Sequence, residues 1–129
     1  KADLLLKLNA LNNNYNYTDP NRKQLVLKTS EDIHLVKIAE IIHCQADQSY
    51  CIFNIIGSKK ILVSRPMGEF EELLNRYDFY RVHKSHMVTL RQVTKYSKSE
   101  GGNLIMSDGS VVPVSFRKKE IVIHKLENI

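Results

Sequence analysis

The densest group of basic and hydrogen-bonding side chains lies between Phe79 and Ser99, in the run FYRVHKSHMVTLRQVTKYSKS, which contains no acidic residue. Five fixed positive charges are interleaved there with apolar residues: Arg81, Lys84, Arg91, Lys95 and Lys98. A basic strip without a local counter-charge is typical of a surface that docks on a polyanion. Nucleic acid is the polyanion that this pattern favours.

Two further basic groups stand beside expected loops. Lys59 and Lys60 follow a turn-forming Gly-Ser pair, at an expected hairpin tip, and Arg117, Lys118 and Lys119 stand near an expected helix start. A β scaffold that presents such loops on one side can follow a duplex backbone while a few side chains reach base edges. The alternative is that these lysines form an ordinary solubilising surface.

The remaining reactive side chains do not predict catalysis. The sequence contains His43, Cys44, Cys51, His83 and His86, but no CxxC or HExxH spacing and no glycine-rich turn before a helix. The adjacent His43 and Cys44 should point to opposite faces of a strand. The sequence therefore predicts neither an enzyme nor a metal centre, and it calls for no cofactor.

The cysteines and the hydropathy pattern indicate the cellular compartment in which the protein is expected. Cys44 and Cys51 are expected to be reduced, buried thiols rather than a disulfide, with redox control as the alternative. No apolar run approaches the roughly 18 to 20 residues that cross a bilayer, and the start of the chain lacks the pattern of a signal peptide. We therefore expect a cytoplasmic protein that does not enter a membrane.

Composition limits the chain to one small basic domain. Its 129 residues carry a net charge of +5 with a pI near 9.2, and 43% hydrophobic with 26% charged residues is the usual balance for a chain with a real core. The first 14 residues place four leucines at helical spacing, and an asparagine-rich stretch follows. We expect residues 1–23 to be a helical segment and linker from a missing N-terminal domain, and residues 24–129 to be the folded domain.

From Gln24 onward the pattern is mainly of strands. They are expected at QLVLK, IHLVK, KILVS and residues 40–45, 50–56, 80–82, 88–96, 103–106 and 111–114. Pro66 should open a helix with apolar residues at 3.6-residue spacing, and Ser115 should cap a final helix over residues 116–126, although EIVIH also suits a strand. Pro113 confines its strand to an edge or a bulge. The pattern predicts a mostly β domain.

Three motifs carry a family resemblance: IHLVKIAEIIHCQADQSYCIFNI, FYRVHKSHMVTL and GGNLIMSDGSVVPVSFRKK. In order and spacing they resemble the LytTR-type DNA-binding domain of bacterial two-component response regulators, over about residues 24–126. The resemblance implies a mostly β fold of short packed antiparallel sheets, with one internal short helix and helical termini. It also implies a preceding receiver domain, which would explain the helix and tether, and a sensor histidine kinase that acts on that receiver.

The resemblance implies DNA contacts by three loops: residues 47–50 face one major groove, residues 83–85 lie over the backbone, and residues 115–118 reach a second major groove. Together with the hairpin lysine, the expected DNA-binding residues are Gln48, Ser49, Tyr50, Lys59, His83, Lys84, Ser85, Arg117 and Lys118. Arg117 suits base readout because its planar donor fork matches guanine O6 and N7, and Lys84 suits a phosphate clamp.

The chain departs from the family pattern at two places. Gln45 stands where many relatives have Glu, and Phe116 occupies a place often taken by a basic residue. The second change removes a possible phosphate contact.

The function expected from these observations is sequence-specific binding of double-stranded DNA, as the output domain of a response regulator that controls transcription. We expect two molecules to pair on repeated half-sites. The alternatives are a protein-interaction module of a LytTR-like signalling system and a small β RNA-binding domain.

Overall fold

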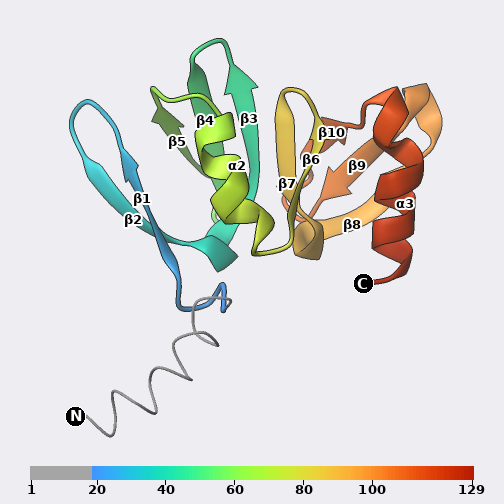
Figure 1. Cartoon of the computed structure of the whole chain (residues 1–129), viewed down its shortest axis with the longest axis horizontal. Coiled ribbons are helices and arrows are strands. Elements are labelled where there is room, and N and C mark those ends of the chain that lie inside the picture. Colours follow the sequence, from blue (N-terminus) through green and yellow to red (C-terminus); the bar gives the residue numbers. More distant parts are fainter. Residues whose placement is uncertain (1–18) are drawn as a thin grey trace, which may run out of the picture.

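The computed structural model describes residues 19–129, so the expected helix over residues 1–14 lies outside the described residues. Three antiparallel sheets lie in a row (Figure 1). The first sheet pairs β1 (Gln24–Lys28) with β2 (Ile33–Lys37). The central sheet has the order β5 (Lys59–Val63), β4 (Tyr50–Ile55), β3 (Ile41–Asp47), β7 (His86–Thr89), β6 (Phe79–His83). The third has the order β10 (Val111–Pro113), β9 (Asn103–Met106), β8 (Val93–Ser97).

Within residues 19–129, two α-helices and four short 3-10 helices connect or cover these sheets. The α-helices are α2 (Gly68–Asn75) and α3 (Lys119–Glu127), and the 3-10 helices are η1 (Ile38–Glu40), η2 (Leu90–Gln92), η3 (Ser99–Gly101) and η4 (Phe116–Lys118). In Figure 1, α2 lies in front of the central sheet and α3 lies on the outer side of the third sheet. The predicted mostly β fold, with a short internal helix and a helical C-terminus, is confirmed.

Strands β3, β7 and β6 of the central sheet are buried on both faces, whereas β5 has one exposed face. Ile41 belongs to a core shared with the first sheet and α2, whereas its neighbour Ile42 belongs to a second core shared with the third sheet and α3. Successive side chains of a strand point to opposite faces, so a strand between two cores needs a continuous apolar run. In β3 all four residues from Ile41 to Cys44 are buried, and three of them are apolar; the exception is His43.

The expected strand over residues 88–96 is wrong in one respect. The chain instead forms β7, then the 3-10 turn η2, then β8, and the two strands belong to different sheets. The backbone N–H of Leu90 donates to the carbonyl of Asp78 (3.1 Å) at the break. No glycine or proline marks this crossing, so composition alone suggested one continuous strand.

The C-terminal expectations are resolved by the structure. EIVIH lies in α3 and is helical, and Val122 is its fully buried residue. Pro113 ends the edge strand β10, as its missing N–H requires. Ser115 takes the cap position before η4, but its side chain makes no capping hydrogen bond.

Residues 19–23, assigned from sequence to the linker, pack against the domain. The backbone N–H of Ala39 donates to the carbonyl of Pro20 (2.9 Å), and that of Ile38 donates to the carbonyl of Lys23 (3.0 Å). Regular pairing begins at Gln24, where the domain was expected to start.

The two cysteines lie in the first core. Cys44 and Cys51 are free thiols with no exposed surface, on the neighbouring strands β3 and β4. Burial raises the pKa of the Cys44 thiol well above its ordinary value, which favours the neutral form. In residues 19–129 no helix is long and apolar enough to cross a membrane.

Leu74 of α2 tests the packing of the first core. Its side chain has no exposed surface, and nearby Phe70 meets Phe53 edge to face with ring centroids 5.0 Å apart. We expect Leu74→Ala to lower the free energy of unfolding by about 2 to 4 kcal/mol, because a cavity remains in the core. Leu62→Ala on β5 is the matched control, since Leu62 is 52% exposed. Urea denaturation measures both, and equal losses would contradict the assigned packing of α2.

Candidate nucleic-acid interface

The β3–β4 and β6–β7 turns lie side by side at one end of the central sheet. Gln45 pairs with His86, and the backbone N–H of Ala46 donates to the carbonyl of Ser85 (2.8 Å). Because β3 and β7 are neighbouring antiparallel strands, the turn that follows β3 and the turn that precedes β7 leave the sheet in the same direction. Both turns lie at the upper edge in Figure 1.

The segment before α3 is fixed to the same end. The backbone N–H of Ser115 donates to the carbonyl of Val82 (2.9 Å), and Nζ of Lys118 donates to the carbonyl of Arg81 (2.7 Å). The start of α3 therefore stands beside β6 at the upper edge in Figure 1. We call residues 47–50, 83–86 and 115–118 the three-loop edge. The structure thus brings the three predicted DNA-contacting loops together.

The β3–β4 turn is tight. Asp47 and Tyr50 form the last pair of the hairpin, with Gln48 and Ser49 between them. Gln48 has a φ of 59°, in the left-handed region that non-glycine residues seldom adopt. Tyr50 keeps 40% of its surface exposed, so its ring stands at the three-loop edge available to a partner.

Lys84 stands at the tip of the β6–β7 turn with its side chain exposed. The turn backbone is held from two sides: Nη2 of Arg81 donates to the carbonyl of Lys84 (2.6 Å), and the N–H of Ser85 donates to Nδ1 of His83 (3.1 Å). Within residues 19–129 the Lys84 ammonium has no ion pair or hydrogen bond. It is a fixed cation whose charge is available to an outside partner.

Arg117 and Lys118 differ in what their charges do. Arg117 is exposed and makes no ion pair with any described residue. Lys118 is half-buried, and its ammonium both donates to a β6 carbonyl and lies 5.1 Å from the ring centroid of Tyr80. Lys118 therefore fastens the loop, whereas Arg117 projects from it.

Sequence reasoning missed Arg81 as the residue that positions two of these loops. Its Nη1 pairs with Oε1 of Glu71 on α2 (2.8 Å), its Nη2 holds the carbonyl of Lys84, and its own carbonyl accepts from Lys118. Only its place within the basic strip marked it beforehand, and that pattern does not distinguish a structural arginine from a binding one.

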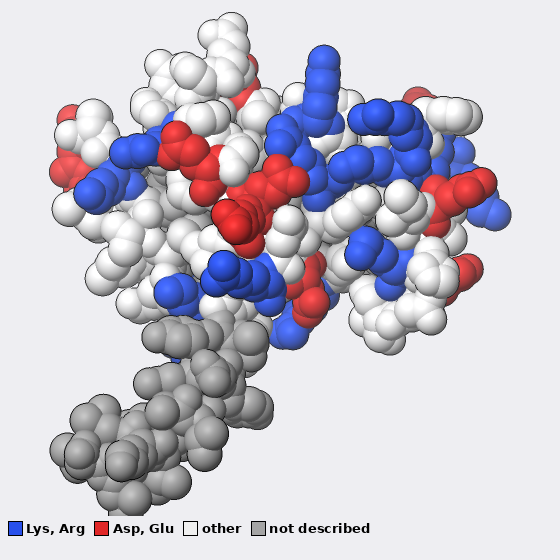
Figure 2. Space-filling view, viewed as in Figure 1, with Lys and Arg blue, Asp and Glu red and all other residues white. Residues whose placement is uncertain are grey.

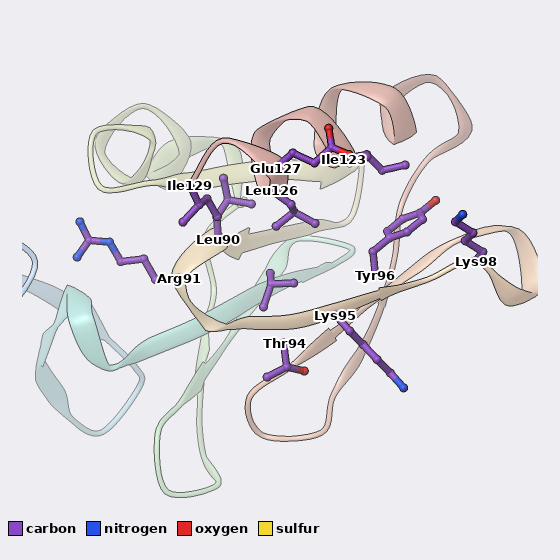
Figure 3. Close-up of a pocket in the computed structure, with 11 residues that line it drawn as sticks. Leu90, Arg91, Thr94, Lys95, Tyr96, Lys98, Ile123, Leu126, Glu127 and Ile129 are labelled. Carbon is purple, nitrogen blue, oxygen red and sulfur yellow. The ribbon is translucent and has the colours of Figure 1, made fainter.

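The basic strip is compensated in part, contrary to the expectation from sequence. Arg81 pairs with Glu71, and Arg91 pairs with Asp78 (2.9 Å). Both acidic partners lie outside the strip, before Phe79 in the sequence. Lys95 and Lys98 lie elsewhere, beside a hollow between β8 and α3 (Figure 3). Only Lys84 of the strip projects from the three-loop edge without a partner among the described residues.

The structure does not bring Lys59 to this edge. Lys59 is the first residue of β5 and pairs with Ile55, at the far end of β4 from Tyr50. Five residue steps of a strand span roughly 17 Å. Lys59 therefore stands at the opposite end of the central sheet, and it is in the strand rather than in the turn.

Figure 2 shows the resulting charge distribution on one face. Lysine and arginine gather over the upper right part of the molecule, where Figure 1 has β6, β7 and the start of α3, and acidic side chains gather over α2. A cationic region beside an acidic one orients an approaching polyanion toward the first.

Three histidines lie behind the β6–β7 turn. The rings of His83 and His86 meet edge to face with centroids 5.3 Å apart, and the amide nitrogen of Asn54 lies 3.4 Å from Nδ1 of His43. Nε2 of His43 and Nδ1 of His86 are buried without a hydrogen-bond partner. Burial, with smaller contributions from His83 and His43, lowers the pKa of His86 to about 4, and burial also lowers the pKa of His43.

These side chains do not assemble a metal site. Among residues 19–129, no group of three or more His, Cys, Asp or Glu side chains is placed to hold a metal ion. The three histidine rings instead fill the space between the central sheet and the turn: His43 is buried, and His83 and His86 are half-buried.

The hollow between β8 and α3 has a volume of about 670 Å³ (Figure 3). Leu90, Leu126 and Ile129 gather at one end, and Tyr96 stands toward the other. Its described lining contains no histidine, cysteine or serine, and its charged residues are Arg91, Lys95, Lys98 and Glu127.

Known proteins resemble this chain in sequence and in fold. The family model described as "LytTr DNA-binding domain" matches residues 31–127. The chain is 29% identical over 96 residues to the CO-responsive transcriptional regulator RcoM of Rhodospirillum rubrum, covering 71% of this chain and 40% of that protein. The chain thus spans well under half the length of this relative.

A solved structure supports the fold. The fold matches the LytTr DNA-binding domain of a protein described as a methyl-accepting/DNA response regulator from Bacillus cereus, with a TM-score of 0.69 and 23% identity. The match covers 82% of this chain and 97% of the other. The resemblance drawn from the three sequence motifs is confirmed.

Burial of neutral His86 makes stability depend on pH. The folded-state pKa is about 4 against an ordinary value of 6.5, so between these values the unfolded chain takes up a proton that the folded protein does not. We therefore expect the free energy of unfolding to fall as pH drops from 6.5 to 4, and His86→Gln to make that fall shallower. His124→Gln is the matched control, because His124 is exposed on α3. Urea denaturation across this range measures the slopes, and identical slopes for the parent and His86→Gln would contradict neutral burial.

Proposed function

Because the chain belongs to the LytTR family of DNA-binding domains, we propose that it binds double-stranded DNA sequence-specifically through the three-loop edge. One observation carries the proposal: Lys84 and Arg117 project two cations without partners among the described residues from loops that are fastened to one another through Arg81. Fixed cations on rigid loops suit a duplex, whose phosphates and base edges stand at set spacings.

The two cations have different roles on DNA. Lys84 is a point charge at the tip of a turn and neutralises a phosphate of the backbone. Arg117 carries a planar fork of donors and reads guanine O6 and N7 in a major groove. The β3–β4 turn with Gln48, Ser49 and Tyr50 faces the other major groove.

The remaining residues of the edge support these contacts. His83 and Ser85 hold the turn over the intervening backbone, and Lys118 fastens the loop that bears Arg117. Lys59 is not part of the proposed interface, because it stands at the other end of the central sheet.

The biological role that we propose is control of transcription, as the output domain of a bacterial response regulator in the cytoplasm. A receiver domain would precede residues 1–23, and a sensor histidine kinase would act on it. Two molecules would bind repeated half-sites, gaining affinity through effective concentration. The names of the two similar proteins, a transcriptional regulator and a response regulator, support this role.

Competition separates this proposal from its alternatives. A duplex sequence selected from a random library with the full 129-residue chain should displace bound probe better than random duplex or RNA of equal length. Equal displacement by RNA would favour an RNA-binding domain, and failure to select any duplex would favour a protein-interaction module.

Lys84→Ala and Arg117→Ala should fail in different ways, although each removes one positive charge. Losing Lys84 should weaken binding to the selected operator and to random duplex alike, and reduce the slope of log affinity against log salt by about one. Losing Arg117 should cost about 1 to 3 kcal/mol on the operator and little on random duplex, because the guanine edge stands only at the right position. Salt titrations of each variant on each DNA measure both effects.

Lys59→Ala is the matched control for charge. Lys59 is exposed at the other end of the central sheet from the three-loop edge, and it makes no ion pair with the described residues. Its loss should change affinity less than either interface substitution. Equal losses on both DNAs for Arg117→Ala would show a backbone contact there instead of base readout.

Arg81→Lys tests whether Arg81 positions the edge. The change keeps the charge but removes the fork that reaches Glu71 and the Lys84 carbonyl together, so affinity should fall on the order of tenfold on operator and random duplex alike. Arg91→Lys is the matched control, because Arg91 also pairs with a carboxylate, that of Asp78 (2.9 Å), but is exposed and follows the end of β7 remote from the β6–β7 turn. Affinity measured well below the unfolding midpoint of each variant separates positioning from stability. An unchanged affinity for Arg81→Lys would remove Arg81 from this role.

A further inference from the structure

Phe116 is the most exposed large apolar side chain of the described residues, with 84% of its surface accessible. Single apolar residues on a surface are ordinary, so exposure alone points to no partner. The position of Phe116 is more specific. It is the first residue of η4 in the three-loop edge, next to Arg117.

The backbone that carries this ring is held in place. On one side of Phe116, the N–H of Ser115 is bonded to the Val82 carbonyl (2.9 Å), and the N–H of Lys118 closes the turn on the Ser115 carbonyl (2.9 Å). Nζ of Lys119 lies 5.1 Å from the ring centroid. Because the backbone is already ordered, only the side chain loses conformational entropy when the ring is buried in an interface.

The neighbours of the ring define its partner. Residues 117–119 are Arg, Lys and Lys, and no acid lies between Ser115 and Lys119. The partner of Phe116 must therefore tolerate the projecting Arg117 and the ammonium of Lys119 beside the ring, and still offer an apolar group. Duplex DNA offers one such group at a base edge in the major groove, the C5-methyl of thymine.

We propose that Phe116 determines part of the sequence specificity by packing against the methyl group of a thymine, at a base step beside the guanine read by Arg117. This inference rests on the proposed docking of the three-loop edge. It adds a second specificity contact of a different kind, because an apolar contact recognises the methyl group without a hydrogen bond and without a charge.

The test replaces thymine by deoxyuridine, which lacks only the methyl group. A duplex is selected with the full 129-residue chain, and each of its thymines is then replaced singly by deoxyuridine. At one position the parent should lose about fourfold in affinity, the factor that corresponds to about 0.8 kcal/mol for one buried methyl-sized group. Phe116→Ala should bind the parent site more weakly and lose nothing further at that same position.

Val111→Ala is the matched control. Val111 is 60% exposed on β10, outside the three-loop edge, so its variant should respond to every deoxyuridine as the parent does. Because Phe116 is almost fully exposed, Phe116→Ala should also leave the thermal unfolding midpoint unchanged, which verifies that the folded protein is being measured.

The outcomes separate this inference from the proposed function. A selected duplex that depends on Arg117 but contains no methyl-sensitive thymine overturns the role of Phe116 alone. Equal sensitivity of the parent and Phe116→Ala to deoxyuridine, or equal loss by Phe116→Ala on operator and random duplex, overturns it as well. If the parent selects no duplex at all, the docking proposal fails and the thymine contact fails with it.

Discussion

Arg81 joins three parts of the molecule that are distant in sequence, and the geometry of the three-loop edge depends on it. One end of its guanidinium pairs with Glu71 on α2, the other end holds the Lys84 carbonyl, and its own backbone carbonyl receives Lys118. The side chains of Arg81 and Glu71 are 28% and 34% exposed, so their ion pair is partly withdrawn from water and less screened than a surface pair. A planar fork can hold two acceptors at once, which an ammonium on a flexible chain does less well.

The geometry of the three-loop edge also requires a fixed strand register in the central sheet. The central sheet lies between two cores, with Ile41 buried in one and Ile42 in the other. A register slip of one residue would exchange the two faces and place His43 and Asn54 where apolar groups belong. Register is therefore strongly fixed in β3, and the turns at its end stand at fixed positions. His43 is buried on β3 and His86 is half-buried at the start of β7, and burial lowers the pKa of both rings.

Local signals in the sequence predicted the hairpins, the helix α2 and the three loops, because turn residues, β-branched runs and 3.6-residue spacing act over a few residues. They did not predict the break at η2, where the chain changes sheets without glycine or proline. Nor did they place Lys59, which begins its strand at the end remote from the β3–β4 turn, or pair Arg81 with Glu71. Each of these depends on which elements meet in space. The family motifs located the three-loop edge more closely than charge did, since charge marks Arg81, Arg91 and Lys84 alike.

The cations at the three-loop edge have two roles: some hold the loops in place, and others are available to bind a partner. Arg81 and Lys118 hold loops, and Lys84 and Arg117 remain for a partner, so the net charge of +5 overstates the charge available to DNA at this edge. Phe116 stands where the family resemblance places a basic residue in many relatives. Exchanging a cation for an aromatic ring there lowers the salt-dependent attraction that all DNA sequences share. A ring that packs against a thymine methyl group contributes binding free energy that depends on the DNA sequence and hardly on the salt concentration. In the interface that we propose, the exchange therefore raises the ratio of specific to non-specific affinity, which decides occupancy when a genome offers many competing sites.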